Sequence, residues 1–222
     1  MFSAITTILA FTALTHASAI PSRRDGTSGT ESMTPHDSYS SSIGVLGCKI
    51  NTDRVAYWPS APDCNKICLK ITGNNGKTLN LLHIDQSGGA YDISYDAWSE
   101  LNCGVPATDG TCQGGGVSMQ YEYVDNSECS SLLTGASGKL AFSAANSMDF
   151  ISSCAAGSWV ADNHALYNIA NPTCTYGYDE VCTLASGANQ ATCAHQLGSQ
   201  EALTSAPVYN IEYPSGQKVL AT

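Results

Sequence analysis

The sequence is poor in positive charge and has no long apolar run. Its 222 residues include nine lysines and arginines against nineteen aspartates and glutamates, which gives a formal net charge of −10. No stretch reaches the roughly 18 consecutive apolar residues that a membrane-spanning helix needs. Because nucleic acids and anionic membranes bind basic surfaces, we expect neither of them as a partner.

Motifs of several enzyme classes are also absent. The sequence has no G-x-S-x-G nucleophile elbow, no glycine-rich phosphate loop and no H-x3-H pair. Cys64 and Cys68 could supply two zinc ligands, but no second pair of cysteines or histidines has zinc-finger spacing. We therefore expect no metal and no cofactor. N-glycosylation is not expected either, because no N-x-S/T acceptor with a non-proline middle residue occurs.

The first 42 residues have the pattern of an exported, processed chain. The uncharged segment 1–14 is short and apolar, and Ala17-Ser18-Ala19 is a small-residue cleavage pattern, so we predict a signal peptide that ends near Ala19. A short propeptide, 20–24, ends in Arg23-Arg24, which resembles the dibasic sites of kexin-type proteases; alternatively, both arginines are simply solvated. Residues 25–42 are rich in serine, threonine and glycine, which predicts a disordered leader.

Ten cysteines follow this segment, and their number indicates up to five disulfides in an oxidising, extracellular or cell-wall environment. Spacing alone does not determine how they pair. Without the dibasic pair, seven basic residues remain against nineteen acidic ones, a formal charge of −12. The cysteines are Cys48, Cys64, Cys68, Cys103, Cys112, Cys129, Cys154, Cys174, Cys182 and Cys193.

Local patterns predict a β-rich unit followed by a less regular extension. Residues 68–84 read as two strands around a Gly-Asn-Asn-Gly turn, residues 95–101 as a short helix, and residues 117–124 as a further strand. Residues 135–222 hold four of the ten cysteines and predict an α+β extension packed on the first unit. Its expected elements are helices at 143–151 and 185–203, and strands within 158–169 and 208–213.

Residues 48–129 resemble the double-psi β-barrel of barwin, the expansins and the bacterial rare lipoprotein A proteins. Segments similar to the family's strands, turn and helix occur in the family's order. The resemblance implies a mainly β fold: a six-stranded barrel over residues 43–134, short helices, and a disulfide-linked extension over residues 135–222. It also implies an open polysaccharide-binding groove across the barrel. The segments that carry the resemblance are Cys64–Thr72, Asn75–Gln86, Gly88–Ser94, Tyr95–Leu101 and Gly115–Asp125.

The resemblance also points to two acidic residues. Asp92 matches the carboxyl required for wall-loosening or lytic action in related proteins, and Asp85 matches a second acid in some of them. Glycosidic cleavage needs two carboxyls, one protonated as an acid and one charged as a base or nucleophile. The alternative is structural, because carboxylates at strand ends and turns often accept backbone N–H bonds.

Four aromatic side chains are candidates for sugar binding, because sugars stack on flat rings that carry polar tips. The competing interpretation of each ring is packing in the core. The candidates are Tyr57, Trp58, Tyr91 and Tyr95.

These observations predict a secreted, monomeric, non-catalytic protein that binds cell-wall polysaccharide or a host extracellular protein, in the manner of an effector or elicitor. Two alternatives remain open. One is a wall-active glycoside hydrolase or lytic enzyme that uses Asp85 and Asp92. The other is a protease inhibitor that presents the rigid loop Pro59 to Pro62.

Overall fold

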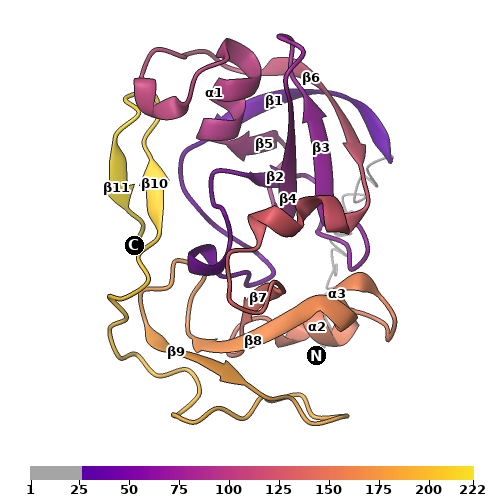
Figure 1. The fold of residues 1–222 in the computed structure, drawn as a ribbon, viewed down its shortest axis with the longest axis vertical. Helices are drawn as coiled ribbons and strands as arrows, with labels where there is room; N and C mark the ends of the chain where they lie inside the picture. Colours follow the sequence, from indigo (N-terminus) through magenta and orange to yellow (C-terminus); the bar gives the residue numbers. More distant parts are fainter. Residues whose placement is uncertain (1–26) are drawn as a thin grey trace, which may run out of the picture.

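The computed structural model describes residues 27–222 and contains three separate β-sheets (Figure 1). One sheet closes into a six-stranded barrel, one has three strands, and one is a two-stranded hairpin. The predicted mainly β fold with a disulfide-linked extension is confirmed. The predicted processing sites at Ala19 and Arg24 lie outside the described residues. Among those residues, no helix is long and apolar enough to cross a membrane.

The barrel is closed by the strand order β1-β5-β2-β4-β3-β6, with β6 paired back to β1. The pairs β1–β5 and β2–β4 are parallel, whereas the other four pairs are antiparallel. The predicted strand–turn–strand unit is present as β3 and β4. The strands are β1 (Ser28–His36), β2 (Val55–Trp58), β3 (Cys68–Thr72), β4 (Thr78–Gln86), β5 (Tyr91–Ser94) and β6 (Val117–Tyr123).

The prediction that residues 25–42 form a disordered leader is wrong, because Ser28–His36 form strand β1. The side chain of Met33 is completely buried, but most of the strand is exposed or half-buried, so its sequence shows no apolar period. Its order comes instead from ladders with β6 on one side and β5 on the other. The six strands therefore run from residue 28 to residue 123 rather than within 43–134.

The barrel encloses an aromatic-rich core, and helix α1 (Tyr95–Cys103) packs against it (Figure 1). Trp98 of this helix is buried, and its indole N–H donates to the Met33 carbonyl at 3.0 Å. The predicted helix at 95–101 is thus confirmed. Three 3-10 helices complete the connections, at Gly47–Lys49, Ala107–Asp109 and Asn126–Leu132.

The extension packs on the outer face of the barrel. Val55, Leu82 and Ile84 of the barrel share one buried cluster with Phe142 and Leu166 of the extension. This second core lies between the barrel and the three-stranded sheet. The elements of the extension are β7 (Leu140–Ser143), α2 (Met148–Ser153), α3 (Trp159–Asn163), β8 (His164–Ile169) and β9 (Gly177–Cys182).

The predicted helix at 185–203 is wrong, because this segment has no helical residues. Gly187 and Gly198 both have positive φ, at 78° and 75°, which is incompatible with a continuous α-helix. The Cys182–Cys193 disulfide closes the start of the segment into a short loop. A composition rich in alanine and glutamine favoured a helix there, but no apolar stripe was available to pack it.

All ten cysteines pair, which confirms the prediction of five disulfides. Two bonds join the barrel unit to the extension: Cys48–Cys174 and Cys64–Cys154. Two lie within the barrel unit, Cys68–Cys129 and Cys103–Cys112, and Cys182–Cys193 lies within the extension.

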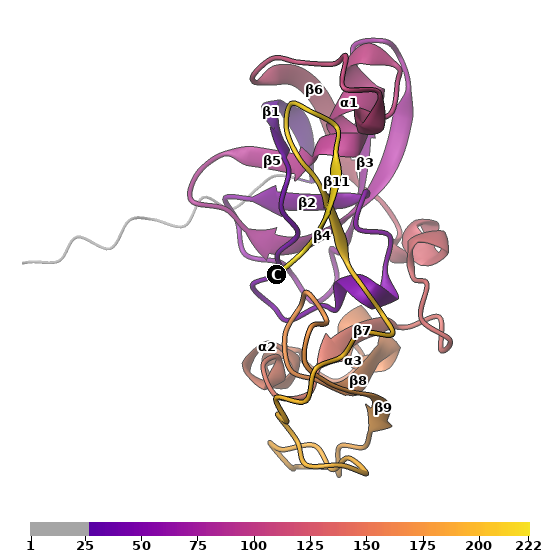
Figure 2. The same cartoon turned by 90° about the vertical axis from the view of Figure 1, so that its left-hand side faces the viewer.

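The chain then returns to the barrel as a C-terminal strap, here defined as residues 208–222. Its strands β10 (Tyr209–Ile211) and β11 (Lys218–Leu220) form an antiparallel hairpin. Figure 2 shows this hairpin, in yellow, crossing in front of the barrel with its tip near α1. The strap therefore bridges the extension and the far end of the barrel.

Candidate functional site

Four side chains occupy one register row across four adjacent barrel strands. Thr34 of β1 pairs with Asp92 of β5, Asp92 pairs with Tyr57 of β2, and Tyr57 pairs with Asp85 of β4. We name this set the carboxylate row. Because neighbouring strands lie about 4.8 Å apart, the two acidic positions are separated by roughly 10 Å of sheet. Tyr57 occupies the position between them.

Asp85 is held by three hydrogen bonds. One carboxylate oxygen accepts from the backbone N–H groups of Ser42 and Gln86, both at 2.8 Å, and the other accepts from the Ser40 hydroxyl. The side chain is 8% exposed. These bonds fasten the loop that follows β1 to the end of β4, so the carboxylate has a clear structural role.

Asp92 is half-buried and accepts a hydrogen bond from the Thr34 hydroxyl. Its neighbours Tyr91 and Ile93 belong to the barrel core, so alternation places Asp92 on the outer face of the sheet. The structure thus brings Asp85 and Asp92 into one row, two strands apart, with Tyr57 between them.

Tyr57 links the row to its surroundings. Burial is the main cause that raises the pKa of its phenol, and the negative charges of Asp85, Asp53 and Asp92 raise it further. The ring also contacts the imidazole of His36, with centroids 4.3 Å apart. Tyr57 is therefore a neutral phenol in an acidic environment, and it separates the two carboxylates.

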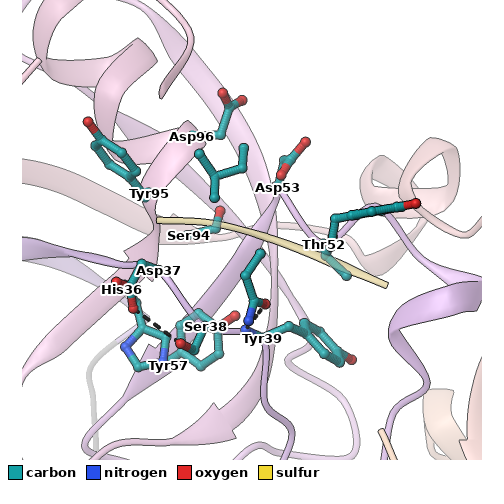
Figure 3. A pocket seen from close by; sticks show the side chains of 13 residues that line it. His36, Asp37, Ser38, Tyr39, Thr52, Asp53, Tyr57, Ser94, Tyr95 and Asp96 are labelled. Atoms are coloured by element: carbon teal, nitrogen blue, oxygen red, sulfur yellow. Dashed lines mark hydrogen bonds between the residues drawn. The ribbon is translucent and has the colours of Figure 1, made fainter. Parts of the chain in front are cut away.

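A narrow crevice lies between this part of the barrel and the C-terminal strap (Figure 3). Its volume is about 20 Å³, which is room for about one water molecule. Three carboxylates line it, from Asp37, Asp53 and Asp96, and Tyr209–Ile211 of the strap form one wall. We name this space the acidic crevice.

The carboxylates of the acidic crevice differ in how they are paired. Asp96 accepts from Arg54 at 2.8 Å and from the Ala107 backbone N–H at 2.9 Å. The same guanidinium reaches Glu100 at 2.5 Å. Burial raises the pKa of Asp53, and the negative charge of Asp96 raises it further. Burial among other acids therefore disfavours the charged form of Asp53.

All four candidate aromatic side chains, Tyr57, Trp58, Tyr91 and Tyr95, are buried, as the competing interpretation of packing in the core expects. Trp58 is 0% exposed and lies inside the barrel, in edge contact with Tyr91 at 5.2 Å and Tyr121 at 4.7 Å. Tyr57 and Tyr95 border the acidic crevice but are also buried. The burial of Tyr57 and Trp58 is indicated by the continuous apolar run Val55–Trp58, because such runs are typical of strands covered on both faces.

A second surface feature was not predicted from the sequence. A hollow of about 350 Å³ lies over strands β1, β3 and β6. Two register rows cross these strands, one formed by Thr72, Gln120 and Thr30, the other by Lys70, Glu122 and Ser28. We name it the polar hollow; its lining residues are Ser28, Gly29, Thr30, Lys70, Thr72, Gln120, Tyr121 and Glu122.

The polar hollow has little net charge. Lys70 and Glu122 form an ion pair across β3 and β6, and the remaining side chains are mainly hydroxyls and an amide. Ser28 and Thr30 come from the segment that was predicted to be disordered, which is why sequence patterns did not find this surface. Within residues 27–222, no group of three or more histidines, cysteines or acids could hold a metal ion.

Neither a protein-family model nor a curated protein matches this chain. Solved structures similar to part of it include cerato-platanin 3 from M. perniciosa (15% identity, TM-score 0.34, covering 46% of this chain and 98% of that one). Cerato-platanin 2 from M. perniciosa has 18% identity, a TM-score of 0.34 and the same coverage. The fungal elicitor cerato-platanin has 20% identity and a TM-score of 0.32, over 44% of this chain and 95% of that one.

At this level of similarity we draw no conclusion from these structures. The closed six-stranded barrel stands on the strand pairing described above. Membership of the barwin and expansin family stays a prediction.

Proposed function

We propose that this protein is a secreted, non-catalytic binding protein whose polar hollow binds an uncharged cell-wall polysaccharide. The observation that carries the proposal is the pair of polar register rows on β1, β3 and β6. Side chains in such rows repeat at the spacing of the strands, about 4.8 Å. This gives a regular series of donors and acceptors, suited to the repeating hydroxyls of a glycan chain.

The chemistry of the lining favours a neutral glycan. Thr30, Thr72 and Gln120 each offer groups that can both donate and accept hydrogen bonds. Lys70 and Glu122 neutralise each other, so the hollow has no excess charge to attract an acidic or a basic polymer. Gly29 packs against the Tyr121 ring: a Cβ at Gly29 would be 3.0 Å from that ring, so its absence lets the two lie close together beside the hollow.

The carboxylate row supports the non-catalytic part of the proposal. Asp85 accepts three hydrogen bonds, and Asp92 lies two strands away with Tyr57 between them. Hydrolysis requires one carboxyl on each side of the same glycosidic bond. The five disulfides fit an extracellular location, since such bonds persist in oxidising compartments.

The test is a pull-down with insoluble β-glucan, cellulose and chitin, combined with a reducing-end assay on the same samples. The double variant Thr30→Ala/Gln120→Ala removes side chains from one row. Losing two hydrogen bonds of about 1 kcal/mol each is expected to weaken binding by roughly tenfold or more. Thr134→Ala, at an exposed position outside the hollow and outside both rows, is the matched control and is expected to bind like the unchanged protein.

Three results would contradict the proposal. Retention of none of the glycans would exclude the ligand class and favour a protein target. Equal retention of the double variant and the unchanged protein would exclude the polar hollow as the site. Release of reducing ends that Asp92→Asn abolishes would establish an enzyme.

A further inference from the structure

The C-terminal strap lies beyond the last disulfide of the chain. Cys193 is the last cysteine, so the 29 residues from 194 to 222 follow the final disulfide. The barrel unit, by contrast, contains two internal disulfides and is joined to the extension by two more. The strap is therefore held in place by non-covalent contacts alone.

The tip of the strap is fastened by few groups. The Tyr213 hydroxyl accepts from the Gly114 backbone N–H at 2.9 Å and donates to the Gly114 carbonyl at 2.6 Å. The Tyr213 ring meets the edge of Tyr95, with centroids 5.1 Å apart. The Tyr95 hydroxyl, which donates to the Cys112 carbonyl at 2.8 Å, also lies 3.3 Å from the Pro214 carbonyl. The tip thus rests on α1 and on the loop that follows it.

Further contacts hold the ends and strands of the hairpin. Val208 and Ala221 are buried in the cluster between the barrel and the extension, and the Tyr213 backbone N–H donates to the Asp37 carboxylate at 3.4 Å. The Tyr39 backbone N–H donates to the Asn210 side chain at 2.9 Å, and Ile211 is buried against the barrel core. Tyr209 and Leu220, which face each other in the register, are 47% and 55% exposed. A two-stranded hairpin is only marginally stable in water, so the strap depends on these contacts to stay closed.

We propose that the C-terminal strap is a lid that opens locally, while the barrel stays folded, and uncovers the acidic crevice. Tyr209–Ile211 form one wall of this crevice, so their departure opens it to solvent. Asp53 and the rings of Tyr57 and Tyr95 then become accessible (Figure 3). This device is independent of the polar hollow and of whatever ligand the hollow binds.

Gly216 provides a way to loosen the lid. The strap packs backbone to backbone there: a Cβ at Gly216 would lie 2.4 Å from the Ala107 carbonyl oxygen, so Gly216→Ala must push the tip away. Gly216 also has a φ of 72°, which by itself strains an alanine. Gly187→Ala is the matched control, because its φ is 78° and no atom lies within 4 Å of its Cβ position.

Two measurements on the full disulfide-bonded protein test the lid. In hydrogen exchange, the strap amides of Glu212, Gly216 and Ala221 are expected to exchange at least about tenfold faster than those of β3 and β4. Gly216→Ala is expected to speed amide exchange in the strap further and to leave the exchange rates of β3 and β4 unchanged. Carbodiimide-coupled labelling of Asp53 with an amine is expected to rise several-fold in Gly216→Ala, relative to exposed Asp125, and to stay constant in Gly187→Ala.

The proposal is overturned if the strap and β3–β4 exchange at the same rate in the unchanged protein, since the strap would then open only with global unfolding. It is also overturned if Gly216→Ala speeds exchange of the strap and the barrel alike. Tyr213→Phe is the milder variant, because it removes only the two hydrogen bonds to Gly114. Unchanged strap exchange and unchanged Asp53 labelling in Tyr213→Phe would equally refute the lid.

Discussion

Substitutions at Asp85 test whether its carboxylate has a structural or a catalytic role. In Asp85→Ala, the backbone N–H groups of Ser42 and Gln86 and the hydroxyl of Ser40 all lose their acceptor. Hydrogen bonds to a charged group contribute about 1.5–3 kcal/mol each when buried. Ser40, Ser42 and Gln86 are exposed, so water replaces part of the loss. We therefore expect Asp85→Ala to lower the free energy of unfolding by about 3 kcal/mol.

Asp85→Asn is expected to cost much less, about 1 kcal/mol. Both backbone N–H groups donate to the same carboxylate oxygen, Oδ1, so an asparagine oxygen at that place keeps both bonds. The amide nitrogen then faces the Ser40 hydroxyl, which can accept as well as donate. Only the charge is lost.

Urea unfolding of the disulfide-intact variants, followed by circular dichroism, measures both costs. Two results would refute the reasoning about Asp85: equal destabilisation by Asp85→Asn and Asp85→Ala, or an alanine variant within about 0.5 kcal/mol of the unchanged protein. Asp92→Ala is the matched comparison, because it removes a single hydrogen bond from a half-buried carboxylate. Its expected cost is about 1 kcal/mol or less.

Two further predictions concern buried polar contacts. Trp98→Phe is expected to destabilise the protein by about 1 kcal/mol more than Trp58→Phe. Both indoles are buried, but within residues 27–222 only the indole of Trp98 has a hydrogen-bond partner, the Met33 carbonyl. Equal losses of stability in urea unfolding would contradict this prediction. Hydrogen bonds from the backbone and ring of His195 are the main causes that lower the pKa of Glu180 to about 2. The charged carboxylate therefore stabilises the fold fully above the ordinary carboxyl pKa of about 4.3. This contribution is lost as the pH falls toward 2. The stability difference between the unchanged protein and Glu180→Gln should therefore shrink between about pH 5 and pH 2, and a difference that stays constant would exclude this role.

Local patterns predicted some elements of the fold well. The β3–β4 hairpin and the helix at Tyr95–Cys103 each carry a complete short-range signal: alternation around a glycine-asparagine turn, and an apolar helical face. The same reasoning failed at Ser28–His36, where the strand has almost no apolar period. It failed again at 185–203, where helix-favouring residues lack a face to pack.

In the candidate site, the sequence likewise indicates individual residues but not their arrangement. A family resemblance points to Asp85 and Asp92, and its aromatic ring points to Tyr57, but nothing local in the sequence relates these residues to Thr34. Their alignment in the carboxylate row depends on the pairing of β1, β5, β2 and β4. The polar hollow depends equally on strands that are far apart in the sequence.

Composition and short-range patterns are enough to predict several features of this protein. These are the acidic charge, the even set of cysteines, the hairpin at β3 and β4, and the helix α1. Other features follow only from the folded chain: which cysteines pair, that Ser28–His36 close the barrel, and that Tyr57 and Trp58 are buried. The physical reason is that strand register and burial are set by contacts between distant segments, such as Thr34 with Asp92 across 58 positions, and short-range periodicity does not encode them.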